Sequence, residues 1–296
     1  MRSNARMHHE LPAGIVQMQD PGGRTAFRLD ADDNSVLISN VGAQVLSWHH
    51  RGRDVLWSAS QAEYLPRKAV RGGVPIVFPW FGDHPTQPKF PAHGFARTLD
   101  WQLAEANAGP SITFVCSDDA TTRALWPFAF RLRFAVTLGT TLQMALTIEN
   151  PGHETFSCEE ALHTYFATGN IRTTSVHGLE NVACKEHAAA PEGSWDHGAP
   201  IHFRAETDRV FQAVPDRIEL HAPALSRRVT LVTEAVRSAI VWNPWPAKTA
   251  RLTQMAADDW ERFVCIESAN VKENPLRIAP GHSHTMKLTL AVDDLR

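Results

Sequence analysis

Hydrophobic and polar residues alternate with a period of two along several stretches of the chain. Between residues 128 and 138 the even positions carry Phe, Leu or Val, and the odd positions carry mostly Ala, Arg or Thr. After a turn at Gly139–Thr141, the alternation resumes over 142–148 and stops at the Asn-Pro-Gly sequence of residues 150–152. A period of two followed by turn-forming residues predicts a long β-hairpin with one face in the core and the other in solvent.

Shorter segments repeat this pattern over the rest of the chain. The segments between them are clusters of Gly, Pro, Asn and Asp, which form turns, and show no helical period of 3.6 residues. Many short strands joined by turns predict an all-β fold, an antiparallel sandwich or barrel. The alternating segments lie at 36–48, 111–116, 217–223, 228–234, 239–245 and 284–292.

The distribution of these segments predicts a single domain over residues 1–296, because no linker or shift in composition divides the chain. About residues 1–25 are expected to form a flexible or peripheral N-terminal extension. No repeat or coiled-coil pattern suggests assembly, so a monomer is expected.

Composition and charge narrow the possible partners. The chain has 296 residues, 43% of them hydrophobic, which is enough for a large core. A net charge of -3 provides no basic surface for nucleic acid, so no nucleic-acid partner is expected. No apolar run approaches the roughly 18 residues of a membrane span, and the N-terminus lacks the apolar stretch of a signal peptide. These features predict a protein of the cytoplasm with no membrane partner.

Cysteines and histidines give no metal-binding pattern. Cys116, Cys158, Cys184 and Cys265 are far apart and form no CxxC pair, so we expect reduced cysteines that mostly fill the core. The pairs His8-His9 and His282/His284 lack a nearby carboxylate or cysteine at zinc-site spacing and are expected to be surface residues. The motifs of phosphate loops, dinucleotide folds, α/β-hydrolases and zincins are also missing from the sequence.

Three segments combine ionisable residues with aromatic or turn-forming neighbours: 71–97, 159–166 and 263–270. In the last of these, the apolar run 263–266 ends at Glu267, so this carboxylate is either a buried acid–base group with a raised pKa or an edge-strand residue facing water. His163 lies among apolar residues and is either a structural histidine or a catalytic one.

The sequence PAHGFAR, residues 91–97, admits two interpretations as well. His93 and Arg97 are suited to a sugar hydroxyl and a phosphate, with Gly94 allowing a sharp turn or a close approach to a ligand. The alternative is a plain turn with a surface arginine. Carbohydrate sites combine aromatic walls with a few polar groups, although each candidate wall, taken alone, is more often a core residue than a sugar platform. These candidates are Trp80, Phe81, Phe95, Tyr165 and Trp245.

Six motifs, in this order and spacing, resemble those of the glucose-6-phosphate 1-epimerases, or hexose-6-phosphate mutarotases, a branch of the aldose 1-epimerase superfamily. The resemblance extends from about residue 30 to the end of the chain. It implies a large antiparallel β-sandwich, the galactose-mutarotase-like supersandwich, and an isomerase that uses no metal and no organic cofactor. The motifs are RGGVPIVFPWFG (71–82), AHGFAR (92–97), EEALHTYF (159–166), TDRVF (207–211), WNPW (242–245) and DDWERFVCIESAN (258–270).

The resemblance also implies roles for individual residues. His163 corresponds to the general acid and Glu267 to the general base. The implied substrate-binding residues are His93, which contacts the sugar, Asp208, which binds hydroxyls, and Arg71 and Arg97, which bind the substrate including its phosphate. Many members have Gln where this chain has Ala92, so one substrate contact of the family is missing here or supplied by another group.

The implied reaction interconverts the α and β anomers of an aldohexose 6-phosphate, glucose 6-phosphate first among them. The ring opens when a base takes the proton of the C1 hydroxyl and an acid protonates the ring oxygen, which requires a bell-shaped dependence of activity on pH. Three alternatives remain open: an aldose 1-epimerase for free hexoses, a sugar-phosphate-binding module without activity, and a glycosidase that uses a second carboxylate such as Glu159 or Glu160.

Overall fold

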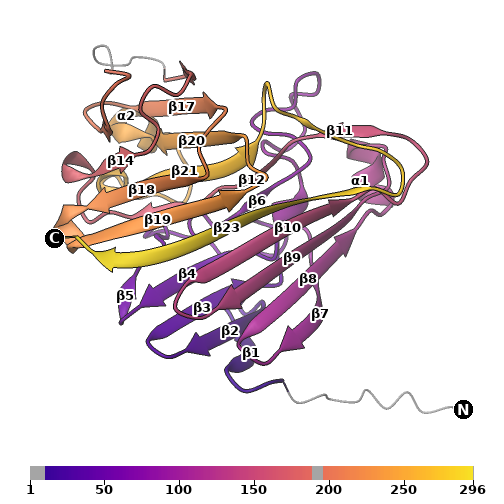
Figure 1. Cartoon of the computed structure of the whole chain (residues 1–296). Helices are drawn as coiled ribbons and strands as arrows, with labels where there is room; N and C mark the ends of the chain where they lie inside the picture. Colours follow the sequence, from indigo (N-terminus) through magenta and orange to yellow (C-terminus); the bar gives the residue numbers. More distant parts are fainter. Residues whose placement is uncertain (1–10, 189–195, 296) are drawn as a thin grey trace, which may run out of the picture.

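The computed structural model describes residues 11–188 and 196–295, and nearly all of its regular structure is β (Figure 1). Every pair of neighbouring strands in its sheets is antiparallel, as the alternating segments predict. The expected all-β fold is therefore confirmed. Within the described residues, no helix is long and apolar enough to cross a membrane.

The largest sheet has nine strands and forms the broad surface across the middle of Figure 1. The predicted hairpin lies in this sheet as β9 and β10, and Phe134 pairs with Leu146 in its register. The even positions from 132 to 148 are buried except at the turn, so the period of two did identify the core face. In spatial order the strands are β16 (Ile201–His202), β14 (Ser175–His177), β18 (Arg217–Ala222), β19 (Arg227–Glu234), β23 (Ser283–Asp294), β10 (Leu142–Glu149), β9 (Arg131–Leu138), β8 (Ser111–Ser117) and β7 (Gln102–Asn107).

A second sheet of five strands packs against the hairpin region of the first. Phe27 of the second sheet meets Phe114 of β8 edge to face, with 5.6 Å between the ring centres. One hydrophobic core cluster runs from Ile15 to Leu290 and includes residues of all the larger sheets, which supports the proposed single domain. The five strands are β1 (Ile15–Gln19), β2 (Thr25–Ala31), β3 (Asn34–Ser39), β4 (Val45–His50) and β5 (Arg53–Asp54).

A third sheet carries most of the candidate chemistry. Its central strand, β21 (Phe263–Asn270), is buried along its whole length. The other strands are β15 (Cys184–Glu186), β17 (Thr207–Gln212), β20 (Ser238–Asn243), β12 (Glu160–Leu162), β6 (Ile76–Val77) and β13 (Tyr165–Ala167), and β11 (Phe156–Cys158) pairs separately with β22 (Leu276–Ile278). The helices are α1 (Ala120–Leu125), α2 (Trp245–Thr249) and 3₁₀ turns at 96–98, 171–173, 223–225 and 259–262.

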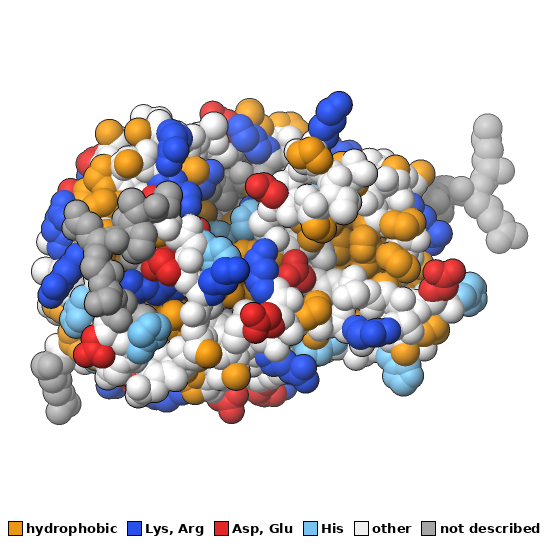
Figure 2. Space-filling view, turned by 90° about the horizontal axis from the view of Figure 1, so that it is seen from above, with side chains coloured by type: hydrophobic (Ala, Val, Ile, Leu, Met, Phe, Trp, Pro, Cys, Tyr) orange, Lys and Arg blue, Asp and Glu red, His pale blue; other side chains and the backbone are white. Residues whose placement is uncertain are grey.

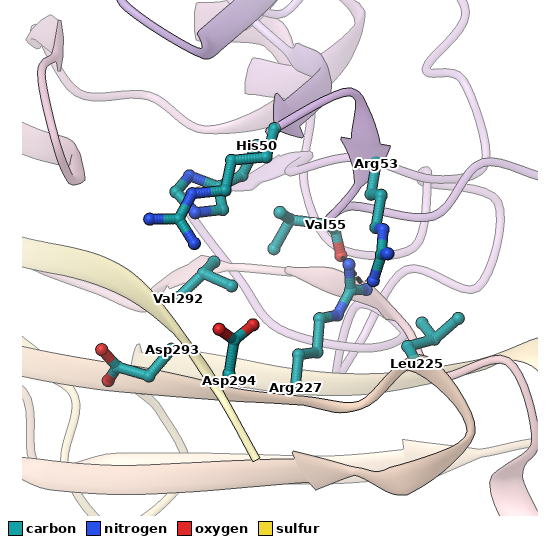
Figure 3. Close-up of a pocket in the computed structure, with 9 residues that line it drawn as sticks. His50, Arg53, Val55, Leu225, Arg227, Val292, Asp293 and Asp294 are labelled. Carbon is teal, nitrogen blue, oxygen red and sulfur yellow. Dashed lines mark hydrogen bonds between the residues drawn. The ribbon is translucent and has the colours of Figure 1, made fainter. Parts of the chain in front are cut away.

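Arg227 joins the sheets at one end of the molecule. Figure 3 shows its side chain rising from β19 beside the carbonyl group of Val55. The guanidinium group donates to Ala167 O at 2.7 Å and also to Asp54 O, so it bonds to backbone from two other sheets. The side chain is only 5% exposed, and burial lowers its pKa to about 10.

Two expectations from the sequence need correction. Part of the segment 1–25, expected to be a flexible or peripheral extension, is regular structure, because residues 15–19 form β1, which pairs with β2 as an edge strand and buries Ile15. His284 was expected at the solvent-exposed surface but is only partly exposed. Its Nε2 lies 3.0 Å from Oε1 of the fully buried Glu160, because β23 begins beside β12 and β21. His282 is exposed, and His8-His9 lies outside the described residues.

All four cysteines are free, and three are buried.

Gly94 brings the HGFAR segment against the backbone of Phe78 through a sharp turn. Its φ is +69°, and a Cβ at this position would lie 2.0 Å from Phe78 O. The contact extends β6 toward residue 94 and fixes the path of the chain between His93 and Arg97.

We therefore expect Gly94→Ala to lower the free energy of unfolding by about 3 kcal/mol, combining left-handed backbone strain with overlap. Gly109 is a matched control, because its φ is +77° but nothing lies within 4 Å of its Cβ position. Gly109→Ala should cost only about 1 kcal/mol. Urea unfolding of both variants measures the difference, and equal losses would contradict the close approach at Gly94.

Candidate active site

All six residues implied by the sequence line one pocket. They come from five separate parts of the chain, which the third sheet and its adjoining loops bring together. Figure 2, which views the molecule from above Figure 1, shows histidine side chains within a hollow on the face where β17 and α2 lie, with Lys or Arg side chains nearby. The pocket lining comprises Arg71, Phe81, Gly82, Asp83, Ala92, His93, Arg97, His163, Tyr165, Asp208, Ile240, Trp242, Lys248, Leu252 and Glu267.

The register against β21 places His163 beside Glu267. Leu162 of β12 pairs with Ser268, and Tyr165 of β13 pairs with Cys265, so the register is unchanged and His163 lies opposite Glu267. Between them, Thr164 O accepts from the backbone N–H of Ile266 at 3.1 Å. The backbone N–H of His163 donates to Pro75 O at 3.0 Å, away from β21. In this arrangement the side chains of His163 and Glu267 face each other, with 3.4 Å between Nε2 and Oε1.

Burial controls the protonation of this pair. His163 is 7% exposed and Glu267 only 2%. Loss of hydration raises the pKa of Glu267 well above its ordinary value, and Asp208 adds to this rise. Burial, reinforced by the charge of Arg97, lowers the pKa of His163 to about 3. Both shifts favour the neutral form of the group concerned. Among the described residues, neither His163 Nδ1 nor Glu267 Oε2 has a hydrogen-bond partner.

His93 is a neutral hydrogen-bond donor in this pocket. Burial and the nearby Arg97 lower its pKa well below the ordinary value. Its Nδ1 accepts from the backbone N–H of Gly82 at 3.3 Å. A backbone N–H can only donate, so the ring proton of neutral His93 belongs on Nε2. The ring also lies 5.6 Å from that of His163, centre to centre.

Two arginines give the pocket positive charge that no protein carboxylate neutralises directly. Arg71 Nε donates to Thr253 O at 2.9 Å, and Arg97 Nη2 donates to Ala92 O. In the described part of the chain, neither guanidinium group forms a salt bridge. Loss of hydration lowers the pKa of Arg97, and an anion in the pocket would oppose that effect.

Asp208 is held by a lysine that the sequence did not single out. Lys248 Nζ lies 3.3 Å from Asp208 Oδ2 and 3.0 Å from Glu206 Oε1. Burial raises the pKa of Asp208, while Lys248 acts in the opposite direction. Lys248 lies on α2, directly after the WNPW motif, and that proximity to a motif was the signal available in the sequence.

The aromatic residues divide into pocket and core. Two of the candidate walls, Phe81 and Tyr165, line the pocket, and His163 stacks on Tyr165 with ring centres 4.9 Å apart. Trp80 and Phe95 belong to the core cluster instead. Trp245 packs against Trp260, and its neighbour in WNPW, Trp242, is the one that lines the pocket. The motif was correctly chosen, but the wrong tryptophan was selected within it, because Trp245 follows β20 while Trp242 lies on it.

Metal-binding geometry is not found in the part of the chain that the structure describes: no group of three or more His, Cys, Asp or Glu residues could hold an ion there. The pocket instead offers hydrogen-bond donors, two guanidinium groups and one acid–base pair. This combination can bind an anionic, hydroxyl-rich ligand and transfer protons on it.

The sandwich and the His–Glu pocket define a class of carbohydrate-active β protein, and comparison with known proteins gives the family. The family model for aldose 1-epimerase matches residues 25–291. A Cenchrus ciliaris protein is 30% identical over 297 residues, covering 95% of this chain and 89% of its own. An Escherichia coli K12 protein is 34% identical, covering 78% of each chain. Both are named "Putative glucose-6-phosphate 1-epimerase".

A solved structure agrees with these relatives. The crystal structure of a "putative mutarotase" from Salmonella typhimurium superimposes with a TM-score of 0.87 at 29% identity, covering 97% of this chain and 96% of the other. This chain belongs to the aldose 1-epimerase family. The resemblance noted in the sequence is thereby confirmed, together with the galactose-mutarotase-like fold.

The raised pKa of Glu267 has a consequence for stability. Its folded pKa exceeds the unfolded value of about 4.3, so the contribution of this group is complete below that pH and is lost as pH rises through the folded pKa. We expect Glu267→Gln to become more stable relative to wild type by up to about 1.4 kcal/mol per pH unit over that range.

Urea unfolding of both proteins between about pH 5 and pH 8 measures this difference. Glu154→Gln provides the control, because Glu154 is exposed and its variant should follow wild type. A difference between Glu267→Gln and wild type that does not change with pH would contradict the raised pKa.

Proposed function

We propose that this protein interconverts the α and β anomers of an aldohexose 6-phosphate, with glucose 6-phosphate as the first candidate. The observation that carries the proposal is the buried His163–Glu267 pair, 3.4 Å apart, in a pocket that also holds two arginines. The names of the two relatives and the description of the similar structure support the same isomerase activity.

Ring opening follows from the two groups of the pair. Glu267 takes the proton of the C1 hydroxyl, while protonated His163 gives a proton to the ring oxygen, and the C1–ring oxygen bond breaks to leave an aldehyde. Rotation about C1–C2 presents the other face of the carbonyl group. Closure then reverses both proton transfers, so the enzyme ends with the protons with which it began.

The protonation of the pair fits this cycle. After ring opening the proton resides on Glu267 and His163 is neutral, which is the arrangement that burial favours in the free protein. The catalytic form for ring opening holds the same single proton on His163. A dianionic substrate beside the pair would favour that form, because negative charge stabilises a protonated imidazole.

The other polar residues would bind the substrate. His93 offers its Nε2–H to a sugar oxygen, and Asp208 accepts from sugar hydroxyls while Lys248 holds its carboxylate. Arg71 and Arg97 would bind the phosphate, since guanidinium groups suit that geometry. Ala92 contributes its carbonyl oxygen to Arg97 and has no side chain that could replace the missing Gln contact.

Other parts of the proposal concern the context of the reaction. Proton transfer by two side chains needs no redox group, so we propose that the protein works without a metal or an organic cofactor. We also propose a single-domain monomer in the cytoplasm, with a small hexose 6-phosphate as its partner and neither nucleic acid nor membrane as another.

Two-dimensional exchange NMR on glucose 6-phosphate tests the activity. Wild type should accelerate anomer exchange above the spontaneous rate, and His163→Ala or Glu267→Gln should each lower the enzymatic rate about 10²–10⁴-fold. The rate should also follow a bell-shaped pH profile, falling when the pair gains a second proton or loses its only one. Binding of hexose 6-phosphate with no acceleration would instead favour a binding module without activity.

The phosphate assignment has its own test. Arg97→Ala should raise KM for glucose 6-phosphate about 10–100-fold and change that for free glucose much less, because a charge-assisted contact is lost only with the phosphorylated sugar. The exposed Arg51 serves as the control, and Arg51→Ala should change neither value. Equal losses on both sugars would favour an aldose 1-epimerase for free hexoses.

The glycosidase alternative loses support from the position of its carboxylates. Glu160 is buried against His284 and Asn270. Glu159 is not among the residues that line the pocket with Glu267, and its carboxylate accepts from the backbone N–H groups of Phe81 and Lys272. Neither residue stands across the pocket from Glu267, as a pair acting on one glycosidic bond would have to do.

A further inference from the structure

Glu159, the first residue of the EEALHTYF motif, joins two loops that are far apart in the sequence. It lies just before β12, and its own N–H donates to Pro79 O at 2.8 Å. Its Oε2 accepts from the backbone N–H of Phe81 at 2.7 Å, and its Oε1 accepts from that of Lys272 at 2.5 Å. One carboxylate therefore fixes the segment after β6 to the turn after β21.

The segment held in this way is the one that supports His93. Gly82 follows Phe81 directly, and its N–H donates to His93 Nδ1 at 3.3 Å. In return, the backbone N–H of His93 donates to Gly82 O at 2.7 Å. The ring of Phe81 meets the His93 ring edge to face, with centres 4.8 Å apart. Position and tautomer of His93 thus depend on where residues 81 and 82 lie.

We propose that Glu159 is a positioning residue of this site, which holds the Phe81–Gly82 segment so that neutral His93 presents its Nε2–H to the pocket. The inference rests on the proposed function for the contact of His93 with the sugar. It concerns a residue that does not itself touch the pocket, and it assigns a purpose to a carboxylate that the catalytic scheme leaves unused.

A carboxylate suits this position better than any neutral side chain. Two N–H groups point at Glu159 from two segments, and each of its two oxygens accepts one of them. Glutamine would offer one oxygen, and its NH₂ group would face the second N–H donor. The cation of Lys272 reinforces the same loop, because Nζ lies 3.5 Å from Phe81 O and 5.4 Å from the centre of the Phe81 ring.

The neighbouring residue, Glu160, does not share the proposed positioning role of Glu159, because successive side chains of a strand point to opposite faces. Glu160 faces the opposite way and bonds to His284 and Asn270, and it is completely buried. Substitution of Glu160 would therefore disturb packing between strands, whereas Glu159 is half-buried and bonds only to backbone groups of the two loops.

Nitrogen-15 NMR of the histidine ring tests the proposal directly. In wild type at neutral pH, His93 should show an unprotonated Nδ1 and a protonated Nε2, with His93→Gln used to assign its signals. In Glu159→Ala the Nδ1–H tautomer should become populated, and kcat/KM should fall about 10–100-fold. Glu159→Gln should lie between wild type and Glu159→Ala, and the control Glu154→Ala, at an exposed position, should match wild type.

A Glu159→Ala protein in which His93 keeps the wild-type tautomer would overturn the proposal, whatever its activity. If its activity then falls in parallel with the melting temperature, Glu159 is a merely structural residue. If wild type does not accelerate anomer exchange, the proposed function fails, yet the tautomer measurement still decides whether Glu159 positions His93.

Discussion

The proposed chemistry depends on the register of two short strands against β21. Leu162 of β12 pairs with Ser268 and Tyr165 of β13 pairs with Cys265, so His163 and Glu267 lie opposite each other. Residues directly opposite in an antiparallel pair point their side chains to the same face, and here the imidazole and the carboxyl group meet in a region with almost no exposure to solvent. Burial of two ionisable groups opposes folding, and the large surrounding core compensates for that cost.

The same burial gives the pair its chemical character. Burial pushes each group toward its neutral form, and the proposed reaction moves protons between this pair and the sugar oxygens. Arg71 and Arg97 add positive charge to the pocket, and in the described residues neither forms a salt bridge with a carboxylate. Their charge is therefore free to attract a substrate anion. Acid–base transfer and anion binding thus share one small volume, and each influences the other electrostatically.

Support for this arrangement comes from backbone contacts at its edges. Gly94 holds HGFAR close to Phe78, and Glu159 fastens the neighbouring loop to the turn after β21. Neither residue carries out a chemical step in the proposed mechanism. Both limit how far His93 and Arg97 can move, which matters because proton transfer and phosphate binding are sensitive to displacements of about 1 Å.

The sequence by itself determined the fold class and the family, and it supplied the proposed site residues. Side-chain alternation follows directly from strand geometry, and the order of short motifs identifies a family. The alternation of hydrophobic and polar residues over 128–148 was sufficient to predict the hairpin of β9 and β10. Only the tertiary structure decided which of Trp242 and Trp245 lines the pocket, that Lys248 holds Asp208, and that His284 pairs with Glu160. Those outcomes depend on contacts between strands far apart in the sequence, whose positions no local pattern encodes.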